Sequence, residues 1–188
     1  MSGIPADPPP FAPFPRESSE RIYDSRWCGL RKDRVRLADG TLQDYHVFEV
    51  SEAVCIVPEL ADGSIVMLWQ YRYPHGRSHW EVPAGRVNPG EPPLAAAQRE
   101  LLEETGHRAA RFESLAGFYP VNGISPHYAH VFVARSCARV RSPNPDPTER
   151  MSVHVLPPGE VRERLVRGDF QDGFTALALF QHFARRPG

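Results

Sequence analysis

The residues most able to do chemistry lie in one segment, which runs from Gly85 to Gly106 and reads GRVNPGEPPLAAAQRELLEETG. Four glutamates share this segment with Arg99, and Glu100 and Glu104 are spaced so that a helix would place them one turn apart. Two carboxylates at this spacing repel each other, so they either face solvent, the commoner case for a glutamate pair, or hold a cation. Hard oxygen ligands suit Mg²⁺ or Mn²⁺, which typically bridge to phosphate groups. The segment therefore has the chemistry of a metal and diphosphate site.

A loop followed by a helix must position these side chains. Glycines and prolines in residues 85–93 disfavour regular structure there. From Pro92 onward nearly all residues are strong helix formers, and Gly106 suits a left-handed cap at the end of a helix. We expect a helix that packs Leu94, Ala97 and Leu101 against the core and presents the glutamates on another face.

The complete spacing of the segment resembles the Nudix box, G-x5-E-x7-R-E-U-x-E-E-x-G-U, in which U is aliphatic. Every fixed position matches except the last, where His107 replaces the aliphatic residue. The resemblance implies that Glu100 and Glu104 are metal ligands, with Glu103 as an additional or water-mediated one. It also implies that the backbone carbonyl of Ala84 meets the metal. Arg99 would orient the carboxylates, with Glu91 as its ion-pair partner.

The segments that precede the box narrow the resemblance to one group within the family. QYR at Gln70–Arg72 and WEVPAG at Trp80–Gly85 look like the segments that precede the box in ADP-ribose and ADP-sugar pyrophosphatases. The similarity covers roughly residues 21–184, and it implies that Arg72 and Glu81 face the substrate. After the box, however, the loop VNGISPH has Asn122 in place of a marker proline and His127 in place of an acid. Asn122 is therefore a candidate for reading a different base or sugar, whereas His127 is more simply a surface residue at the start of a strand.

The box itself does not identify the general base, which is the residue that activates water. In the ADP-ribose group it is commonly a glutamate on a mobile loop far downstream, just ahead of a strand. The matching stretch here is DPTER, so Glu149 is the first candidate, with Asp146 and Glu103 as alternatives. A positioned acid or base contributes about 10² or more to a rate.

The resemblance also implies a homodimer, because the N-terminal strands of similar enzymes cross to a second subunit. Trp27 or Tyr23 in this segment could stack on the base of a nucleotide, although either could equally be core.

The expected fold class is α/β, with the Nudix fold: an α/β/α sandwich that has a mixed β-sheet and is preceded by N-terminal antiparallel strands. Residues 1–15 are rich in proline and are expected to be a disordered tail, followed by a single domain at 16–188 with N-terminal strands at 21–50 and a catalytic core at 51–188. Turns at Asp39-Gly40 and Asp62-Gly63 indicate two hairpins. The individual strands are expected at 33–38, 42–50, 53–58, 64–71, 79–83, 111–119, 128–134 and 151–156, and two further helices at 157–168 and 172–185.

Composition agrees with a compact enzyme: 188 residues with 41% hydrophobic and 24% charged residues suit one domain with a real core. A net charge of −1 argues against binding nucleic acid through bulk charge. We expect no membrane span and no secretory signal, hence a cytoplasmic location. The cysteines, Cys28, Cys55 and Cys137, are expected to be buried thiols.

Together these features predict a Mg²⁺-dependent pyrophosphohydrolase that cleaves a nucleoside diphosphate sugar, foremost ADP-ribose into AMP and ribose 5-phosphate. The alternatives are hydrolysis of another substrate of this kind (a GDP-sugar, a dinucleotide or capped RNA) and a noncatalytic regulator that binds nucleotide sugars. The intact carboxylate cluster favours an enzyme.

Overall fold

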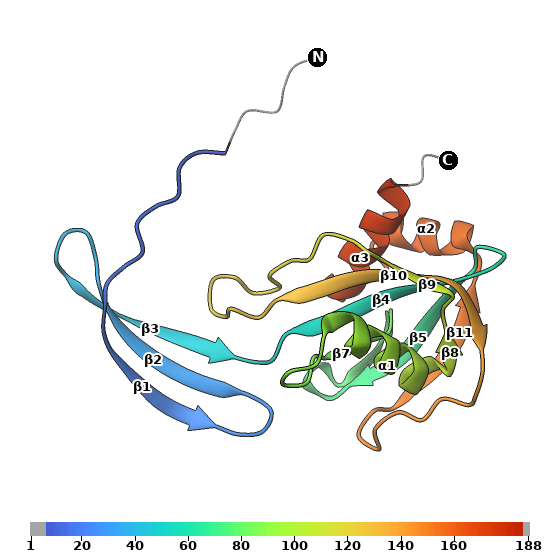
Figure 1. Ribbon diagram of the computed structural model, residues 1–188, viewed down its shortest axis with the longest axis horizontal. Coiled ribbons are helices and arrows are strands. Elements are labelled where there is room, and N and C mark those ends of the chain that lie inside the picture. Colours follow the sequence, from blue (N-terminus) through green and yellow to red (C-terminus); the bar gives the residue numbers. More distant parts are fainter. Residues whose placement is uncertain (1–6, 186–188) are drawn as a thin grey trace, which may run out of the picture. The chain divides into compact units, whose positions relative to one another are not determined.

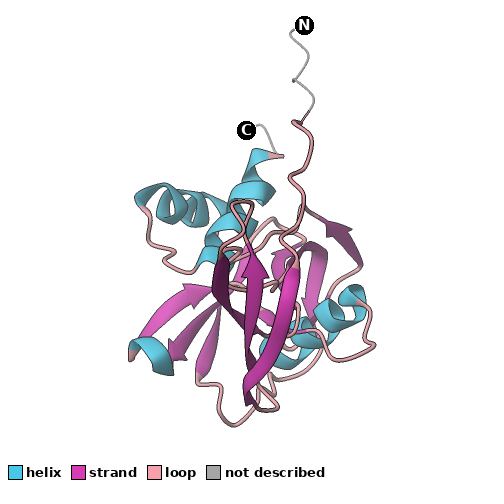
Figure 2. Ribbon diagram, turned by 90° about the vertical axis from the view of Figure 1, so that its left-hand side faces the viewer, coloured by secondary structure: helices cyan, strands magenta, loops and turns pink. Residues whose placement is uncertain are grey.

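The computed structural model describes residues 7–185, which form two compact units that divide between Val50 and Ser51. The tail predicted for residues 1–15 lies partly outside the described residues, and residues 7–15 contain no helix or strand. The first unit is a twisted antiparallel sheet in the order β1-β2-β3 (Figures 1 and 2). Its strands are β1 (Arg16–Asp24), β2 (Gly29–Arg36) and β3 (Leu42–Glu49).

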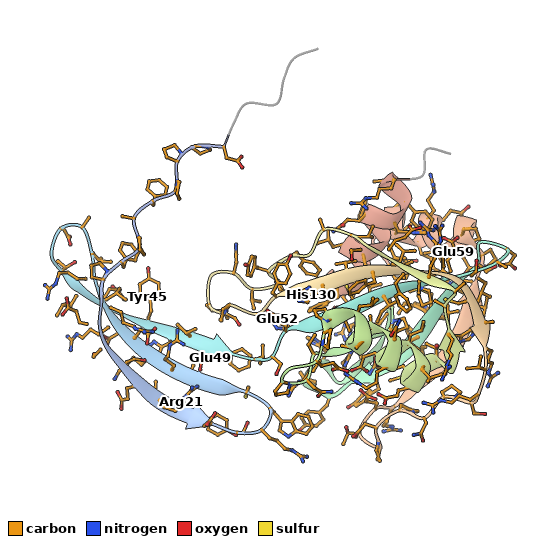
Figure 3. The ribbon with its side chains drawn as sticks, in the orientation of Figure 1. Arg21, Tyr45, Glu49, Glu52, Glu59 and His130 are labelled. Atoms are coloured by element: carbon orange, nitrogen blue, oxygen red, sulfur yellow. The ribbon has the colours of Figure 1, made fainter. Side chains whose placement is uncertain are left out.

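The first strand begins earlier than the sequence indicates. β1 starts at Arg16, whereas strands were expected only from residue 21, and β2 starts at Gly29 rather than at Asp33. The segment RESSERIYD is exposed along its whole length, so it lacks the alternation of apolar and polar residues that marks a half-buried strand. Backbone pairing with β2 joins it to the sheet, together with ion pairs such as that of Arg21 with Glu49, which point toward each other in Figure 3.

The second unit is built on a mixed sheet in the order β11-β5-β4-β10-β8, with β6, β7 and β9 paired to its members (Figure 1). β4 and β10 run parallel, and the other pairs are antiparallel. The strands are β4 (Ala53–Leu60), β5 (Ile65–Arg72), β6 (Arg77–Glu81), β7 (Ala84–Arg86), β8 (His107–Arg108), β9 (Arg111–Ser114), β10 (Ala129–Arg139) and β11 (Met151–Leu156). The helices are the 3-10 turn η1 (Tyr73–His75), α1 (Pro93–Thr105), α2 (Pro158–Arg167) and α3 (Gly173–Ala184).

Two hydrophobic clusters cover the two faces of this sheet. Alternate residues of β4 divide between them: Val54 and Ile56 pack with Leu101 of α1, whereas Cys55 and Val57 pack with residues of α2 and α3. This alternation is what a central strand buried on both faces requires. The predicted α/β/α sandwich with a mixed sheet and preceding antiparallel strands is therefore confirmed.

Several strands begin or end at residues other than those predicted. β9 ends at Ser114 rather than at Tyr119, with only an isolated bridge at Phe118, and β10 continues to Arg139 rather than ending at Ala134. The segment from residue 85 is not wholly irregular, because Ala84–Arg86 forms β7. Both predicted hairpin turns form, and Gly40 and Gly63 adopt the left-handed conformation that such turns need.

The cysteines differ from one another. Cys55 and Cys137 are buried, and burial raises the pKa of each thiol to about 12. Cys28 is only half-buried, beside Ser25 at the tip of the β1–β2 hairpin, so the prediction of a buried thiol is wrong there. The hairpin tip is too small to enclose it.

None of the helices within residues 7–185 has the length and apolar character that crossing a membrane requires.

Candidate active site

Helix α1 places two glutamates on its buried side. Glu100 and Glu104 face the sheet together with Ala97 and Leu101, whereas Glu103 points outward with 40% of its side chain exposed. The helix ends as predicted at Gly106, whose left-handed conformation lets its N–H bond the carbonyl of Leu102. An i, i+4 carboxylate pair that is buried needs a compensating partner, because charge is costly to remove from water.

The pair lies against the short strand β7. Glu104 is almost wholly buried, and one of its oxygens accepts a hydrogen bond of 3.0 Å from the backbone N–H of Ala84. Burial raises the pKa of Glu104 well above its usual value, and the charges of Glu100 and Glu149 raise it further. Burial also raises the pKa of Glu100, although the hydrogen bond from Arg99 opposes this. The site therefore concentrates negative charge that a cation would relieve.

Gly85 makes room for this arrangement. A Cβ built on Gly85 would lie 2.1 Å from the carboxylate of Glu100, closer than any real contact. The backbone of β7 can approach the helix only because this residue has no side chain. The glycine that opens the segment thus makes room for the Glu100 side chain rather than for a turn, which its position in the sequence alone does not reveal.

Replacing Gly85 with alanine is expected to lower turnover about 10²-fold while leaving the protein folded. The flexible Glu100 side chain can swing away from the new methyl group, but a shift of about 1 Å at a reacting centre can cost that much. Steady-state kinetics and thermal denaturation measure the two effects. Gly159→Ala is the matched control, because a Cβ there meets nothing within 4 Å. A Gly85→Ala enzyme with normal turnover would contradict the fit described here.

Arg99 organises the acids around it. Its Nε and one terminal nitrogen donate to both oxygens of Glu91 at 3.0 Å, and the same terminal nitrogen donates to the carbonyl of Arg86. The other terminal nitrogen donates to Glu100 at 2.7 Å and to Glu103 at 3.2 Å. The hydrogen bonds from Arg99 lower the pKa of Glu91 to about 2. All five guanidinium donors are used, so Arg99 fixes the loop, Glu100 and Glu103 in one geometry.

A second ion pair lies beside the carboxylates. The guanidinium of Arg72 at the end of β5 donates to both oxygens of Glu81, at 2.9 and 3.1 Å from Nε. Glu81 is buried, whereas 40% of the Arg72 side chain is exposed. Burial lowers the pKa of Arg72, but Glu81, and more distantly Glu104, outweigh it and raise the pKa. The ion pair with Glu81 thus fixes the positive charge of Arg72 at the edge of the acidic site.

The strand that carries Glu81 is anchored by residues that the sequence did not single out. The backbone N–H of Val82 donates to the hydroxyl of Thr175, and that hydroxyl donates to Asp172, the N-cap of α3. Asp172 caps its own helix, but nothing in the sequence linked α3 to the residues before the box. A contact between residues so far apart has no local signal.

The last position of the box is filled by a buried histidine. His107 is 5% exposed, and its Nδ1 lies 3.0 Å from the carbonyl oxygen of Thr105 and 3.1 Å from its hydroxyl. Burial lowers the pKa of His107, which favours the neutral ring. The ring therefore occupies the buried place of an aliphatic residue, and the departure from the pattern is accommodated by a local hydrogen bond.

The other candidates lie in three places. Glu149 is in the segment before β11, where its charge acts on Glu100 and Glu104, and Asp146 bonds to it there. Asn122 is exposed in the turn at 120–124, and His127 binds the carbonyl of Ser51 at 2.7 Å. Trp27 and Tyr23 belong to the first unit and are about half-exposed, with the guanidinium of Arg26 over the ring of Trp27. Within the second unit, the structure groups the box glutamates, Arg72, Glu81 and Glu149.

Comparison with known proteins agrees with this site. Residues 50–176 match the NUDIX domain, which is more than half of the chain. The chain belongs to the Nudix family. Residues 16–48, which hold most of the first unit, match the nucleoside diphosphate sugar hydrolase N-terminal domain. The protein is thus a Nudix pyrophosphohydrolase of the group that acts on nucleoside diphosphate sugars.

Individual relatives of this Nudix protein carry different substrate names. An ADP-ribose pyrophosphatase of Mycobacterium tuberculosis is 35% identical over 88% of this chain and 81% of its own length. A CMP-5'-(N-acetyl-N-hydroxy-3-aminopropyl)phosphonate hydrolase of Streptomyces rubellomurinus is 30% identical over 84% of this chain and 76% of its own. The crystal structure of an ADP compounds hydrolase superposes with a TM-score of 0.81 at 21% identity, covering 95% of this chain and 96% of that one. This last likeness concerns the fold.

Proposed function

We propose that this Nudix protein hydrolyses the diphosphate of ADP-ribose to AMP and ribose 5-phosphate with the help of Mg²⁺. The observation that carries the proposal is the buried pair of Glu100 and Glu104 beside β7, in a chain whose N-terminal strands match those of nucleoside diphosphate sugar hydrolases. The relative from M. tuberculosis named for ADP-ribose aligns with most of the chain and favours this substrate.

The residues of the site fit a hard divalent cation. The donors are all oxygens, and burial together with the charges of neighbouring glutamates disfavours the charged form of both carboxylates unless a cation compensates them. Within residues 7–185 no three His, Cys, Asp or Glu side chains form a ready-made metal cluster. Glu100, Glu104 and the carbonyl of Ala84 would hold the ion together with substrate and water, with Glu103 as a support.

Each residue has a task in the proposed reaction. When bound, Mg²⁺ would neutralise the diphosphate and make a water molecule more acidic. Glu149 would take the proton from that water molecule while the water oxygen attacks phosphorus. Arg72, held by Glu81, would bind a diphosphate oxygen with its exposed edge, and Arg99 would keep Glu100 in place.

Stacking of a nucleobase on Trp27 or Tyr23 stays a prediction from the sequence, and Asn122 would read the sugar or base. Trp27 and Tyr23 each expose about half of their surface, which leaves ring area for a base. One relative is named for a substrate that contains CMP, so the nucleobase is the part of the substrate that an experiment should test first.

A substrate panel tests the proposal. Purified protein with Mg²⁺ is incubated with ADP-ribose, ADP-glucose, GDP-mannose, a dinucleotide and capped RNA, and the products are resolved by chromatography. Release of AMP and ribose 5-phosphate at the highest kcat/KM of the panel is the expected result. A preference for GDP-mannose, the dinucleotide or capped RNA would select one of the alternative substrates, and no hydrolysis of any of them would favour a regulator that only binds.

We also propose that the protein acts as a homodimer. Val35 is the only buried apolar residue in the described part of the first unit, and its strands expose Ile22, Tyr23, Leu42, Tyr45 and Phe48. A three-stranded sheet needs a covered hydrophobic face to be stable. Light scattering after size exclusion measures the mass, and a fully active monomer would remove the proposal.

A further inference from the structure

The segment that carries Glu149 is fixed at both of its ends. Near its start, the backbone N–H of Asn144 donates to the carbonyl of Glu103 in the last turn of α1, at 2.7 Å. At its end, the carbonyl of Arg150 accepts a hydrogen bond of 2.9 Å from the N–H of Tyr71, and the guanidinium of Arg150 lies over the Tyr71 ring. Residues 144–150 therefore span from the metal-binding helix to the strand that bears Arg72.

Between these anchors, Asp146 and Glu149 bond each other reciprocally. The N–H of Asp146 donates to Oε2 of Glu149 at 2.9 Å, and the N–H of Glu149 donates to the carbonyl of Asp146 at 2.8 Å. The Asp146 side chain accepts from both the N–H and the hydroxyl of Thr148, at 2.9 and 2.7 Å. The Glu149 side chain bonds back to the Asp146 N–H as the glutamate of a capping box does, but the Asp146 side chain accepts from Thr148, two residues on, and no helix follows the turn.

The turn determines what each carboxylate is able to do. Oδ1 of Asp146 accepts from two donors of Thr148, so this oxygen serves to close the turn. One oxygen of Glu149 is held by a backbone N–H, and the other is left for proton transfer. The segment reaches α1 beside this pair, where Asn144 bonds the carbonyl of Glu103, and the charge of Glu149 acts on both Glu100 and Glu104.

We propose that Asp146 and Thr148 are positioning residues for Glu149: their turn fixes the Glu149 carboxylate at the edge of the Glu100 and Glu104 pair before substrate binds. This inference rests on the proposed function, because it assigns Glu149 the proton of the attacking water. It also separates two acids that the sequence left as alternatives for the same role. Preorganisation of this kind acts on turnover rather than on affinity, since Asp146 touches no substrate in this scheme.

Asparagine and alanine at residue 146 distinguish the two roles. The amide oxygen of Asp146→Asn still accepts from Thr148, whereas Asp146→Ala has no acceptor. We expect Asp146→Ala to lower kcat for ADP-ribose about tenfold with KM nearly unchanged, and Asp146→Asn to regain most of that loss. Thr148→Val should fall between them, because it loses only the hydroxyl bond. Glu149→Gln, which removes the base itself, should lose about 10² or more. Glu163→Gln on the exposed side of α2 is the matched control.

Three results would overturn the inference. Equal losses of about 10² in Asp146→Asn and Asp146→Ala would make Asp146 the base. Wild-type turnover in Asp146→Ala would show that the turn is dispensable. Wild-type turnover in Glu149→Gln would show that Glu149 is not the base, so the turn would have no base to position. Amide hydrogen exchange of Asp146 and Glu149 gives a reading that needs no substrate: we expect protection in the wild type that Asp146→Ala loses, and fast exchange in both would contradict the turn. A failure of the proposed function is seen separately, as a wild-type enzyme that hydrolyses nothing in the substrate panel while the protection remains.

Discussion

Replacing Glu104 with glutamine is expected to abolish hydrolysis and, at the same time, to stabilise the metal-free protein. Turnover should fall about 10³-fold, since a ligand of the catalytic ion contributes several kcal/mol to the transition state. The amide oxygen of glutamine can still accept the hydrogen bond from Ala84, so the fold loses no contact. What it loses is a buried negative charge next to Glu100.

The stabilisation should depend on pH in a definite direction. The folded-state pKa of Glu104 lies well above its value in the unfolded chain, so the folded protein binds more protons between these two values. The contribution of Glu104 to stability is fully present below the unfolded pKa and is lost as the pH rises through the folded pKa. The glutamine variant should therefore melt higher than the wild type at pH 8 and show a smaller difference at pH 5.

Thermal denaturation of both proteins in EDTA, at pH 5 and pH 8, measures this effect. For a chain of this size each kcal/mol moves the melting temperature by about 2–4 °C. Added Mg²⁺ should raise the melting temperature of the wild type more than that of Glu104→Gln, because binding to the folded state stabilises it. Glu163→Gln serves as the control for loss of an exposed charge. A Glu104→Gln protein that melts lower at pH 8 would show that the buried carboxylate is already compensated.

Replacing Arg99 with lysine should impair both activity and stability, although the charge is kept. An ammonium group has three donors and no planar fork, so it cannot serve Glu91, Glu100, Glu103 and the carbonyl of Arg86 together. We expect roughly 2 kcal/mol of lost stability, discounted from a fully buried network because 30% of the side chain is exposed. Turnover should fall about 10²-fold as Glu100 loses its fixed orientation.

Chemical denaturation and steady-state kinetics test this prediction against Arg167→Lys. Arg167 also pairs with a carboxylate, that of Asp169, but 60% of its side chain is exposed, so its replacement should change stability by less than about 0.5 kcal/mol. If the two lysine variants lose similar amounts of stability and turnover, the network around Arg99 is only a surface ion pair. Normal turnover with reduced stability would limit its role to the fold.

The sequence predicts those parts of the protein whose signals are local. Helix α1 ends where the helix formers meet Gly106, and the hairpins turn at the glycines that their geometry needs. The pairing of Glu100 with Glu104 follows from helical spacing. β1 was missed because its side chains are mostly polar and exposed, so it has no local apolar pattern; backbone pairing with β2 and ion pairs with β2 and β3 join it to the sheet.

Other features depend on contacts that no local pattern encodes. The need for glycine at residue 85 arises from the approach of Glu100, fifteen positions away, and Val82 depends on Thr175 of the last helix. Asp146 and Glu149 were both recognisable as acids ahead of a strand. The hydrogen bonds that join the two acids within one turn are a property of the folded segment alone.

The parallel pairing of β4 with β10 also bears on how the protein folds. Ala53 lies opposite Ala129, so this ladder closes a loop that contains β5, β6, β7 and the whole of α1. Closing so long a loop costs chain entropy before its contacts form, whereas the β1–β2–β3 hairpins join neighbours in the sequence. The hairpins are thus expected to form early and the central ladder late. Because α1 packs on both β4 and β10, the catalytic helix would be held firmly only after the slowest step of folding is complete.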